Sequence, residues 1–340
     1  MLVTLPYKIL VDKDVKTKIA GTIKSLNVGK KCTVISSSRI QKIVGKNILD
    51  EISSSFDVNF IEPVSSENGH IKSIVGGIKT DFIIGIGGGR TIDIAKYIAH
   101  LSGKPWIAFP TILSHDGVVS SRAVLENNGS KISLDASEPS AIIADLNIIK
   151  KADYNYLAAG IGDLISNFSA VEDWKLAEKA GKENYHEIMA KLSLVSAEAA
   201  AMHISNIKKK DYHGLEILFW SLVSAGFAMN IYGSSRPCSG SEHNISHALD
   251  KLGSEALHGK QVALCTIVSV YLQKGDWKKI RELMIKAGLP TSAKDLKIEN
   301  KMMVEALVNA RKIRNRYTVL DRYSFTKASA EKVLKKTQII

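Results

Sequence analysis

Short apolar runs rich in β-branched residues alternate with amphipathic stretches through the first 150 residues of the chain. Runs of this kind, bounded by polar and glycine-containing turns, are typical of buried strands. Alternation of such strands with helical stretches predicts a parallel sheet covered by helices. The predicted strands span residues 32–35, 57–61, 82–86, 106–109 and 141–144.

One segment of this first half has a different pattern. Between residues 119 and 133, two short strand-like runs flank the turn sequence Glu-Asn-Asn-Gly-Ser at 126–130. Asparagine and glycine favour the tight turns that join antiparallel strands, so this segment predicts a β-hairpin.

In the second half, apolar positions recur at helical spacing and few strand candidates remain. The change of pattern predicts two domains, an α/β domain over residues 1–150 and an all-helical domain over residues 151–340. The predicted helices span residues 158–180, 185–208, 215–231, 241–252, 262–273, 278–287, 302–313 and 329–335.

Charge narrows the class of partner. The 340 residues carry a net charge of +12, with lysine clusters at 208–210 and 335–336. No aromatic residues are interleaved with these lysines, so a solvated surface is favoured over a nucleic-acid patch. A basic nucleic-acid-binding protein is the rival from another class, and we expect no nucleic-acid partner.

Cysteines and apolar runs bear on the compartment. Three cysteines without a CxxC pair fit a reducing environment. The N-terminus lacks the apolar core of a signal peptide. The most apolar run, residues 217–232, is shorter than a bilayer span and fits a buried core helix. We therefore expect a cytoplasmic protein without membrane insertion.

A glycine cluster is the most informative motif. The strand candidate at 82–86 ends in Gly87-Gly88-Gly89, and apolar residues at helical spacing follow over 92–99. A strand, glycine turn and helix offer bare backbone N–H groups and a positive helix end to a phosphate. The motif predicts a nucleotide site. Its spacing differs from GxGxxG, and a plain tight turn is the alternative.

Carboxylate and imidazole side chains gather near helix starts in the second half. Asp163 follows a Gly-Ile-Gly sequence, His243 and His247 share one helix face, and His258 precedes a further helix. An aspartate with two or three histidines from separate helices suits a catalytic Zn²⁺, which leaves one position open. Histidines at this spacing are also common without metal. The order Glu-His-x-x-x-His argues against a zinc protease, whose glutamate lies between its histidines.

Four blocks in order carry a resemblance to a known family. They are GGGRTID at 87–93, PTILSHDG at 110–117, GIGDL at 160–164, and RPCSGSEH at 236–243 with His258-Gly259 behind it. The chain resembles the sn-glycerol-1-phosphate dehydrogenases of archaea. Their superfamily also holds the iron-containing alcohol dehydrogenases, glycerol dehydrogenases and dehydroquinate synthases.

The resemblance implies a dehydroquinate synthase-like α/β fold, with a Rossmann-like NAD(P)-binding domain followed by a helical domain for metal and substrate. It implies that Asp163, His243 and His258 bind one metal ion, Zn²⁺ first, with Fe²⁺ or Ni²⁺ open. It further implies that Asp116, Asp163 and His247 are the catalytic and substrate-binding groups. The implied cofactor-binding residues are Gly87, Gly88, Gly89, Arg90, Thr91, Ile92, Asp93, Thr111, Ser114 and Ser120.

The implied activity is the NAD(P)H-dependent reduction of dihydroxyacetone phosphate to sn-glycerol 1-phosphate, used for archaeal membrane phospholipids. The metal would polarise the C2 carbonyl of this substrate. A polyol dehydrogenase acting on unphosphorylated glycerol or dihydroxyacetone is the alternative. Such relatives often self-associate, so we expect a homo-oligomer.

The substrate phosphate needs donors. We expect them at the helix start at 239–241, with Arg236 and Lys260 near it in sequence. A salt bridge is the alternative role for Arg236. Ser239 and Glu242 have the spacing of a capping box, which predicts that a helix begins there.

The first predicted strand ends in Ser36-Ser37-Ser38-Arg39. It lacks the acidic residue that often accepts the adenosine ribose hydroxyls and repels a 2′-phosphate. Serines followed by an arginine can accept such a phosphate, so the sequence predicts use of NADPH as well as NADH.

Overall fold

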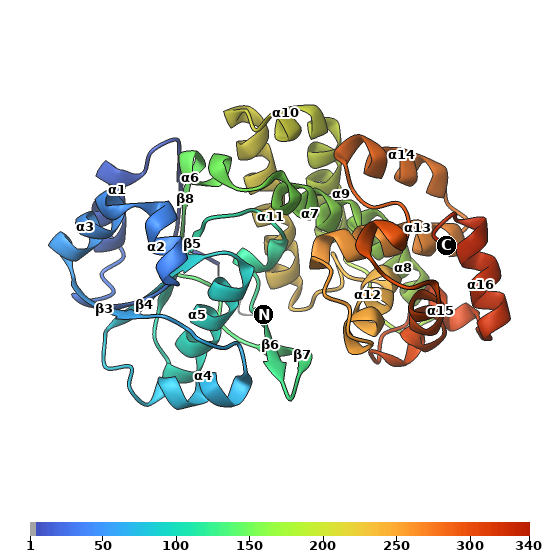
Figure 1. The fold of residues 1–340 in the computed structure, drawn as a ribbon, viewed down its shortest axis with the longest axis horizontal. Helices are drawn as coiled ribbons and strands as arrows, with labels where there is room; N and C mark the ends of the chain where they lie inside the picture. The colour runs from blue at the N-terminus through green and yellow to red at the C-terminus, as the bar shows by residue number, and fades with distance from the viewer. Residues whose placement is uncertain (1–4) are drawn as a thin grey trace. The chain divides into compact units, whose positions relative to one another are not determined.

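The computed structural model describes residues 5–340, which form two compact units. The first unit holds the residues up to Asp153 together with Lys210–Glu216, and the second holds Tyr154–Lys209 and Ile217–Ile340. Figure 1 shows the elements in chain order. The first unit is a sheet covered by helices, and the second is built from helices.

A six-stranded sheet with the order β1-β8-β5-β4-β2-β3 organises the first unit, and all of its strand pairs are parallel. The five predicted strands are confirmed. An edge strand at the N-terminus escaped prediction because its short apolar core lies between charged residues. The strands are β1 (Lys8–Asp12), β2 (Lys31–Ile35), β3 (Asp57–Ile61), β4 (Phe82–Gly87), β5 (Trp106–Pro110) and β8 (Ala141–Asp145).

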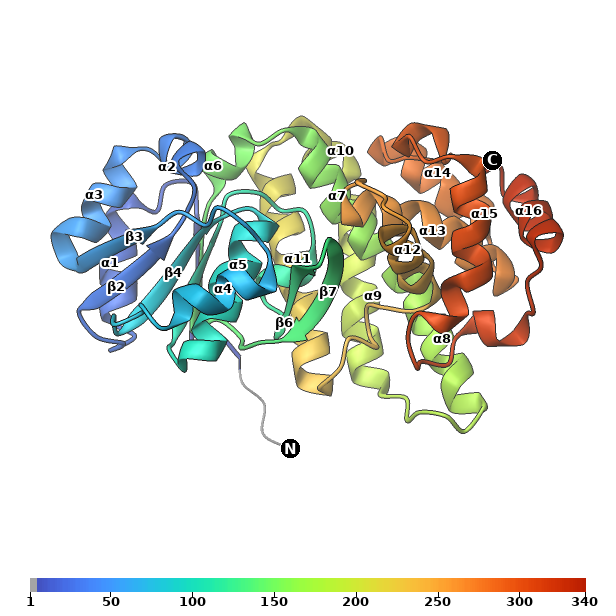
Figure 2. The same cartoon turned by 60° about the horizontal axis from the view of Figure 1, so that its bottom comes forward.

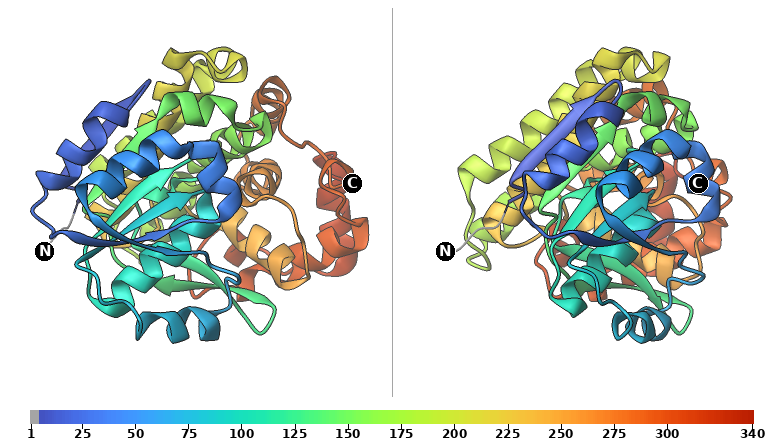
Figure 3. Two further views of the ribbon diagram at one scale, coloured as in Figure 1. Left: turned by 60° about the vertical axis from the view of Figure 1, so that its left-hand side comes forward. Right: turned by 90° about the vertical axis from the view of Figure 1, so that its left-hand side faces the viewer.

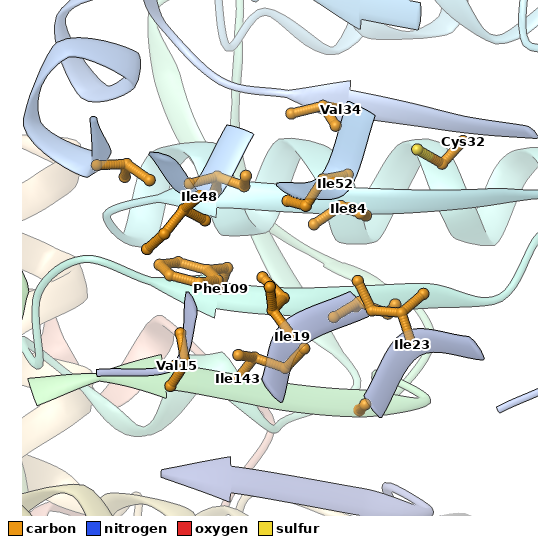
Figure 4. Close-up of a cluster of buried hydrophobic side chains, with 14 of the residues drawn as sticks. Val15, Ile19, Ile23, Cys32, Val34, Ile48, Ile52, Ile84, Phe109 and Ile143 are labelled. Carbon is orange, nitrogen blue, oxygen red and sulfur yellow. The ribbon is translucent and has the colours of Figure 1, made fainter. Parts of the chain in front are cut away.

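Helices lie on both faces of this sheet (Figures 2 and 3). Ile19 and Ile23 of α1 and Ile48 and Ile52 of α3 join strand residues in one buried apolar cluster, shown in Figure 4. The opposite face contacts α5, which follows the glycine turn. The helices of this unit are α1 (Lys16–Lys24), α2 (Ser38–Val44), α3 (Lys46–Ser55), α4 (Asn68–Val75), α5 (Gly89–Ser102) and α6 (Leu146–Lys151).

The predicted hairpin is confirmed. Strands β6 (Arg122–Asn127) and β7 (Ser130–Asp135) pair antiparallel across a two-residue turn. Asn128 and Gly129 both have positive φ, at 52° and 73°, as the twist-compatible turn requires.

A short return of the chain completes the first unit. Tyr212 donates a hydrogen bond to Asn147 at 2.7 Å, and the ammonium groups of Lys13 and Lys150 lie 4.7 and 4.6 Å from the centre of its ring. Helix α11 (Tyr212–Tyr232) begins here and continues into the second unit. Among the residues described, α11 alone is long and apolar enough to cross a membrane, and 61% of its apolar window is buried in the protein.

The second unit contains the predicted helices with two breaks. The segment 158–180 divides at Ser166, whose hydroxyl bonds back to the Asp163 carbonyl at 2.6 Å. The segment 185–208 divides at His203. Such local bonds compete with the helix ladder and leave little trace in apolar periodicity. The helices are α7 (Tyr154–Ile165), α8 (Asn167–Lys179), α9 (Glu187–Met202), α10 (Ile204–Lys209), α12 (Ser241–Lys251), α13 (His258–Leu272), α14 (Trp277–Ala287), α15 (Asn300–Asn309) and α16 (Lys327–Lys336).

The contact between β4 and α5 generates a stability prediction. A Cβ added to Gly85 would lie 2.6 Å from the Cβ of Ala95, inside the sheet–helix contact. We expect Gly85→Ala to lower the free energy of unfolding by about 1–3 kcal/mol through overpacking. Gly21, in α1, has no atom within 4 Å of an added Cβ, so Gly21→Ala is the matched control. It should raise the free energy by roughly 0.5–1 kcal/mol. Urea unfolding followed by circular dichroism measures both, and equal effects would contradict this account.

Candidate functional site

Three helices bring one carboxylate and two imidazoles together in the second unit. Asp163 comes from α7, His243 from α12, and His258 from the first turn of α13. The Asp163 Oδ1 atom lies 3.8 Å from Nε2 of each histidine. The ligand atoms of all three lie within 4.8 Å of one another. Donor atoms this close fit one divalent cation, since nitrogen and oxygen bind Zn²⁺ at about 2.0–2.2 Å.

A glycine permits this convergence. A Cβ on Gly162 would lie 2.5 Å from the Gly259 carbonyl oxygen and 2.9 Å from the Cβ of Ala263. The backbones of α7 and α13 therefore approach more closely here than any side chain allows. The approach sets Asp163 beside His258, because Asp163 directly follows one of the two contacting glycines and His258 directly precedes the other.

A buried carboxylate orients one of the imidazoles. Glu242 is fully buried, and its Oε1 lies 2.9 Å from His243 Nδ1. A proton on Nδ1 facing Glu242 leaves the Nε2 lone pair directed toward Asp163, which is the tautomer a metal ligand needs. Burial lowers the pKa of His243 well below its usual value, and the charge of Arg314 lowers it further. The imidazole is therefore neutral and able to coordinate.

His247 lies one turn further along α12 and outside the group of three. Its ring centre is 6.2 Å from that of His243 and 5.9 Å from that of His258. Its Nδ1 lies 3.4 Å from Asp250 Oδ2, and its Nε2 contacts the guanidinium of Arg314. The geometry thus separates the histidines, which residue spacing alone could not do.

The glycine turn lies at the carboxyl end of β4 in the first unit. Gly88 precedes α5, so the first N–H groups of a fourteen-residue helix face this edge of the sheet. Added Cβ atoms would clash at all three glycines, with Ile112 at 2.8 Å for Gly88 and with His115 at 2.3 Å for Gly89. A small cavity borders the turn, and its lining includes the predicted residues Gly87, Gly88, Gly89, Ile92 and Ser114.

Two hydroxyls at this edge fit a ligand. Thr111 Oγ1 and Ser36 Oγ are buried, and within residues 5–340 neither has a hydrogen-bond partner. They follow β5 and β2, the strands on either side of β4. The order of the strands reverses between β2 and β4, which is where open α/β sheets bind nucleotides.

Asp93 has a supporting place instead of facing this cavity. It lies 3.2 Å from the buried ammonium of Lys96 and accepts from the Val124 amide at 3.2 Å. The Lys96 ammonium also donates to the carbonyls of Gly117 and Arg122, at 2.5 and 2.6 Å. Asp93 and Lys96 thereby fix the loop that carries Asp116.

Asp116 and its neighbours do not form a catalytic triad. His115 Nδ1 accepts from the Gly117 amide at 2.9 Å, and burial lowers the pKa of His115, so its ring is neutral. Burial raises the pKa of Asp116 to about 7, while the charge of Lys96 opposes that rise. A carboxyl with such a pKa can give or take a proton near neutral pH. The remaining predicted cofactor residues Arg90, Thr91 and Ser120 lie in α5 and after the Asp116 loop.

Comparison with known proteins assigns the family. A model of the iron-containing alcohol dehydrogenases matches residues 10–153. A protein of Thermococcus sibiricus named glycerol-1-phosphate dehydrogenase [NAD(P)+] is 40% identical and aligns with 100% of this chain and 98% of its own. The protein of the same name from Methanosphaera stadtmanae is 37% identical, over 99% and 98%. The chain belongs to the glycerol-1-phosphate dehydrogenase family.

Solved structures agree with this fold. A glycerol dehydrogenase from Schizosaccharomyces pombe superposes with a TM-score of 0.80 at 22% identity, covering 99% of this chain and 90% of that one. A probable glycerol dehydrogenase from Sinorhizobium meliloti gives 0.80 at 20% identity, over 99% and 97%. The expected dehydroquinate synthase-like fold is confirmed.

Within this glycerol-1-phosphate dehydrogenase fold, the expected phosphate donors are engaged elsewhere. Arg236 is fully buried and pairs with Glu183 and the Tyr317 carbonyl, so the salt-bridge alternative holds. Lys260 donates to Asn155 at 2.6 Å.

The expected capping box at the start of α12 is wrong. The N-terminal cap is Gly240, and its amide donates to Glu242 at 2.5 Å. The Ser241 amide donates to Asp173 Oδ2 at 2.6 Å. A fully buried carboxylate from α8 therefore does the work expected of Ser239. Burial and the nearby charge of Glu242 raise the pKa of Asp173 to about 6.

Sequence reasoning missed two arginines at this helix start. Arg314 donates to Ser239 Oγ at 2.8 Å and to His247, while Arg316 donates to the Ser239 carbonyl at 2.7 Å. The available signal was the cationic run at 311–316, where four of six residues are arginine or lysine.

The segment after β2 has no acidic residue of its own, but a carboxylate that follows another strand contacts it. Glu62 follows β3 and accepts from the amide of Ser38 at 2.8 Å and from its hydroxyl. These bonds hold the pKa of Glu62 below its usual value, so it is charged at neutral pH. The prediction that NADPH is used rests on the residues that follow β2. It did not include Glu62, which follows the neighbouring strand β3.

Glu62 generates a prediction about cofactor preference. A carboxylate at this edge disfavours a 2′-phosphate. We expect Glu62→Gln to lower the ratio of the NADPH to the NADH Michaelis constant by about fivefold, the scale of an exposed charge interaction. Asp50→Asn, an exposed charge change in α3, is the control and should leave the ratio unchanged. An unchanged ratio in Glu62→Gln would show that this carboxylate does not reach the cofactor.

Glu242 generates a prediction about metal affinity. Replacing it with Gln removes the charge that orients His243, so the dissociation constant for Zn²⁺ should rise about 10- to 100-fold. Isothermal titration of the metal-stripped protein measures this directly, with circular dichroism checking the fold. Glu255→Gln, an exposed change between α12 and α13, is the control. An affinity for Glu242→Gln within twofold of the unmodified protein would contradict the role given to Glu242.

Proposed function

We propose that this chain reduces dihydroxyacetone phosphate to sn-glycerol 1-phosphate with NAD(P)H, in the cytoplasm and as a homo-oligomer. The observation that carries the proposal is the grouping of Asp163, His243 and His258, in a chain whose full-length relatives bear this enzyme's name. Residues 1–150 would bind the cofactor, and residues 151–340 the metal and the substrate.

The metal role falls to three residues. Asp163, His243 and His258 would hold one divalent cation, with Glu242 fixing the tautomer of His243. Bound there, Zn²⁺ or Fe²⁺ would supply Lewis-acid polarisation of the C2 carbonyl. One carboxylate and two imidazoles leave a coordination position for the substrate, as catalytic sites require.

The cofactor role falls to the glycine turn and the loop after β5. The bare amides of Gly88 and Gly89 and the start of α5 suit a pyrophosphate. Arg90, Thr91, Ile92, Thr111, Ser114 and Ser120 would line the rest of the site, with Asp93 supporting it from beneath. The nicotinamide of the cofactor supplies the hydride.

Two groups are placed for proton handling. When C2 receives the hydride, its oxygen must gain a proton. We assign His247 to relaying that proton, with Asp250 facing its Nδ1 and fixing the ring. Its Nε2 accepts from Arg314 in this structure, so it can take the proton only when that guanidinium has turned away. Asp116 would contact a substrate hydroxyl, and its pKa of about 7 suits a group that donates and accepts hydrogen bonds.

The alternative substrate is unphosphorylated glycerol. Relatives named for the phosphorylated substrate are 37–40% identical along the chain, whereas the glycerol dehydrogenase structures are 20–22% identical. The phosphorylated substrate is therefore the better supported one. The glycerol dehydrogenase structures support only the shared fold.

An assay of the purified protein tests the proposal. We expect dihydroxyacetone phosphate, far more than dihydroxyacetone, to drive oxidation of NADH and of NADPH. Metal removal by a chelator should abolish the reaction, and added Zn²⁺ should restore it. Chiral analysis of the product should give sn-glycerol 1-phosphate. Equal rates with dihydroxyacetone would favour the polyol dehydrogenase, and full activity after verified metal removal would overturn the role given to the metal.

A further inference from the structure

A cationic pocket lies in the second unit, and one of its lining residues, Arg314, contacts His247. It has a volume of about 460 Å³ and is formed by the chain around 182–183 and 311–321. Five cationic side chains line it: Lys182, Arg311, Lys312, Arg314 and Arg316.

The acidic residues of this pocket are already paired with arginines. Glu183 pairs with the buried Arg236, and Asp321 lies 3.0 Å from Nε of Arg311. Five cations against two acids leave the pocket with an excess of positive charge. Such an excess favours an anionic occupant.

Arg314 connects this pocket with the Asp–His group. It lines the pocket, and its guanidinium also donates to His247 Nε2 and to Ser239 Oγ. An anion held by Arg314 would thus lie one side chain away from His247. Arg316 holds the segment 235–239 as well, because it donates to the Ser239 carbonyl at 2.7 Å and to Ser235 Oγ at 3.0 Å.

We propose that Arg314 binds the phosphate of the substrate where it lines this pocket, so that one side chain both recognises the phosphate and positions His247. The inference rests on the proposed function, because it names the group that selects a phosphorylated ketone. A guanidinium presents five N–H donors in a planar fork that matches phosphate oxygens.

The dimensions of the substrate fit this assignment. In dihydroxyacetone phosphate, one methylene and one ester oxygen separate C2 from the phosphate. If the C2 carbonyl lies beside Asp163, His243 and His258, the phosphate lies beyond these residues by about the width of one side chain. His247, whose ring centre lies within 6.2 Å of both other rings, covers that interval, and Arg314 comes next.

The other cationic groups fit less well. Arg236 is fully buried in its contacts with Glu183 and Tyr317, and Lys260 contacts Asn155. Lys182 and Lys312 line the same pocket, but no contact with the histidines is recorded for them among residues 5–340. They would attract the anion at longer range.

Kinetics of Arg314→Gln and Arg314→Lys test the proposal. We expect Arg314→Gln to lower kcat/KM for dihydroxyacetone phosphate at least about tenfold, the scale of lost hydrogen bonds to a charged group. Arg314→Lys keeps the charge without the fork and should be intermediate. Turnover of dihydroxyacetone should fall by a smaller factor, because this ketone still needs His247 but carries no phosphate. The inhibition constant of inorganic phosphate should rise. Arg322→Gln, an exposed change eight residues on, is the matched control and should behave like the unmodified protein.

The outcomes separate the two proposals. An equal loss with both ketones would assign Arg314 to His247 alone and overturn the phosphate role. An unchanged inhibition constant for inorganic phosphate would overturn it as well. If the unmodified protein fails to oxidise NADH with dihydroxyacetone phosphate, the proposed function fails. Thermal-shift titration with inorganic phosphate does not depend on turnover, so it still decides whether Arg314 binds this anion. It requires only that Arg314→Gln or Arg314→Lys folds.

Discussion

The chemistry of this protein depends on how closely two helices approach. At Gly162 and Gly259, α7 and α13 come near enough that an added Cβ would meet a carbonyl oxygen at 2.5 Å. Asp163 directly follows Gly162 and His258 directly precedes Gly259, so the separation of the carboxylate and the imidazole is set by backbone contact. Backbone contact is stiffer than contact between long side chains, and it gives donor atoms the fixed spacing that a metal ion needs.

The third member, His243, depends on buried negative charge. Two fully buried carboxylates, Glu242 and Asp173, take the first amide groups of α12 and anchor the helix that carries His243 and His247. Buried carboxylates are costly to desolvate and persist when several donors satisfy them. Ser169, Gly240 and His243 supply those donors for Glu242. One residue therefore both caps the helix and orients an imidazole.

Residue patterns predicted the local features well and the distant contacts poorly. The strands and the hairpin follow from apolar runs and turn residues, which are local properties. Asp163, His243, His247 and His258 were visible as candidates, but their spacing did not tell the histidines apart. The family resemblance set His247 aside from the metal ligands, and the grouping of Asp163, His243 and His258 likewise leaves it out. Glu62 escaped because its relevance requires β3 to lie beside β2. The contact of Arg314 with Ser239 and His247 joins positions 75 and 67 residues apart, which no local pattern encodes.

The path of the chain has a consequence for how the protein can be divided. Residues 210–216 belong to the sheet-containing unit, and Tyr212 within them lies against Lys13, Lys150 and Asn147. The same residues open helix α11, whose remainder belongs to the other unit. A fragment ending near residue 150 would expose the surface that Tyr212 covers. In the complementary fragment, the first turn of α11 would lack the residues against which it packs. The two halves are thus interleaved modules, and a simple cut or gene fusion at the apparent boundary would leave both incomplete.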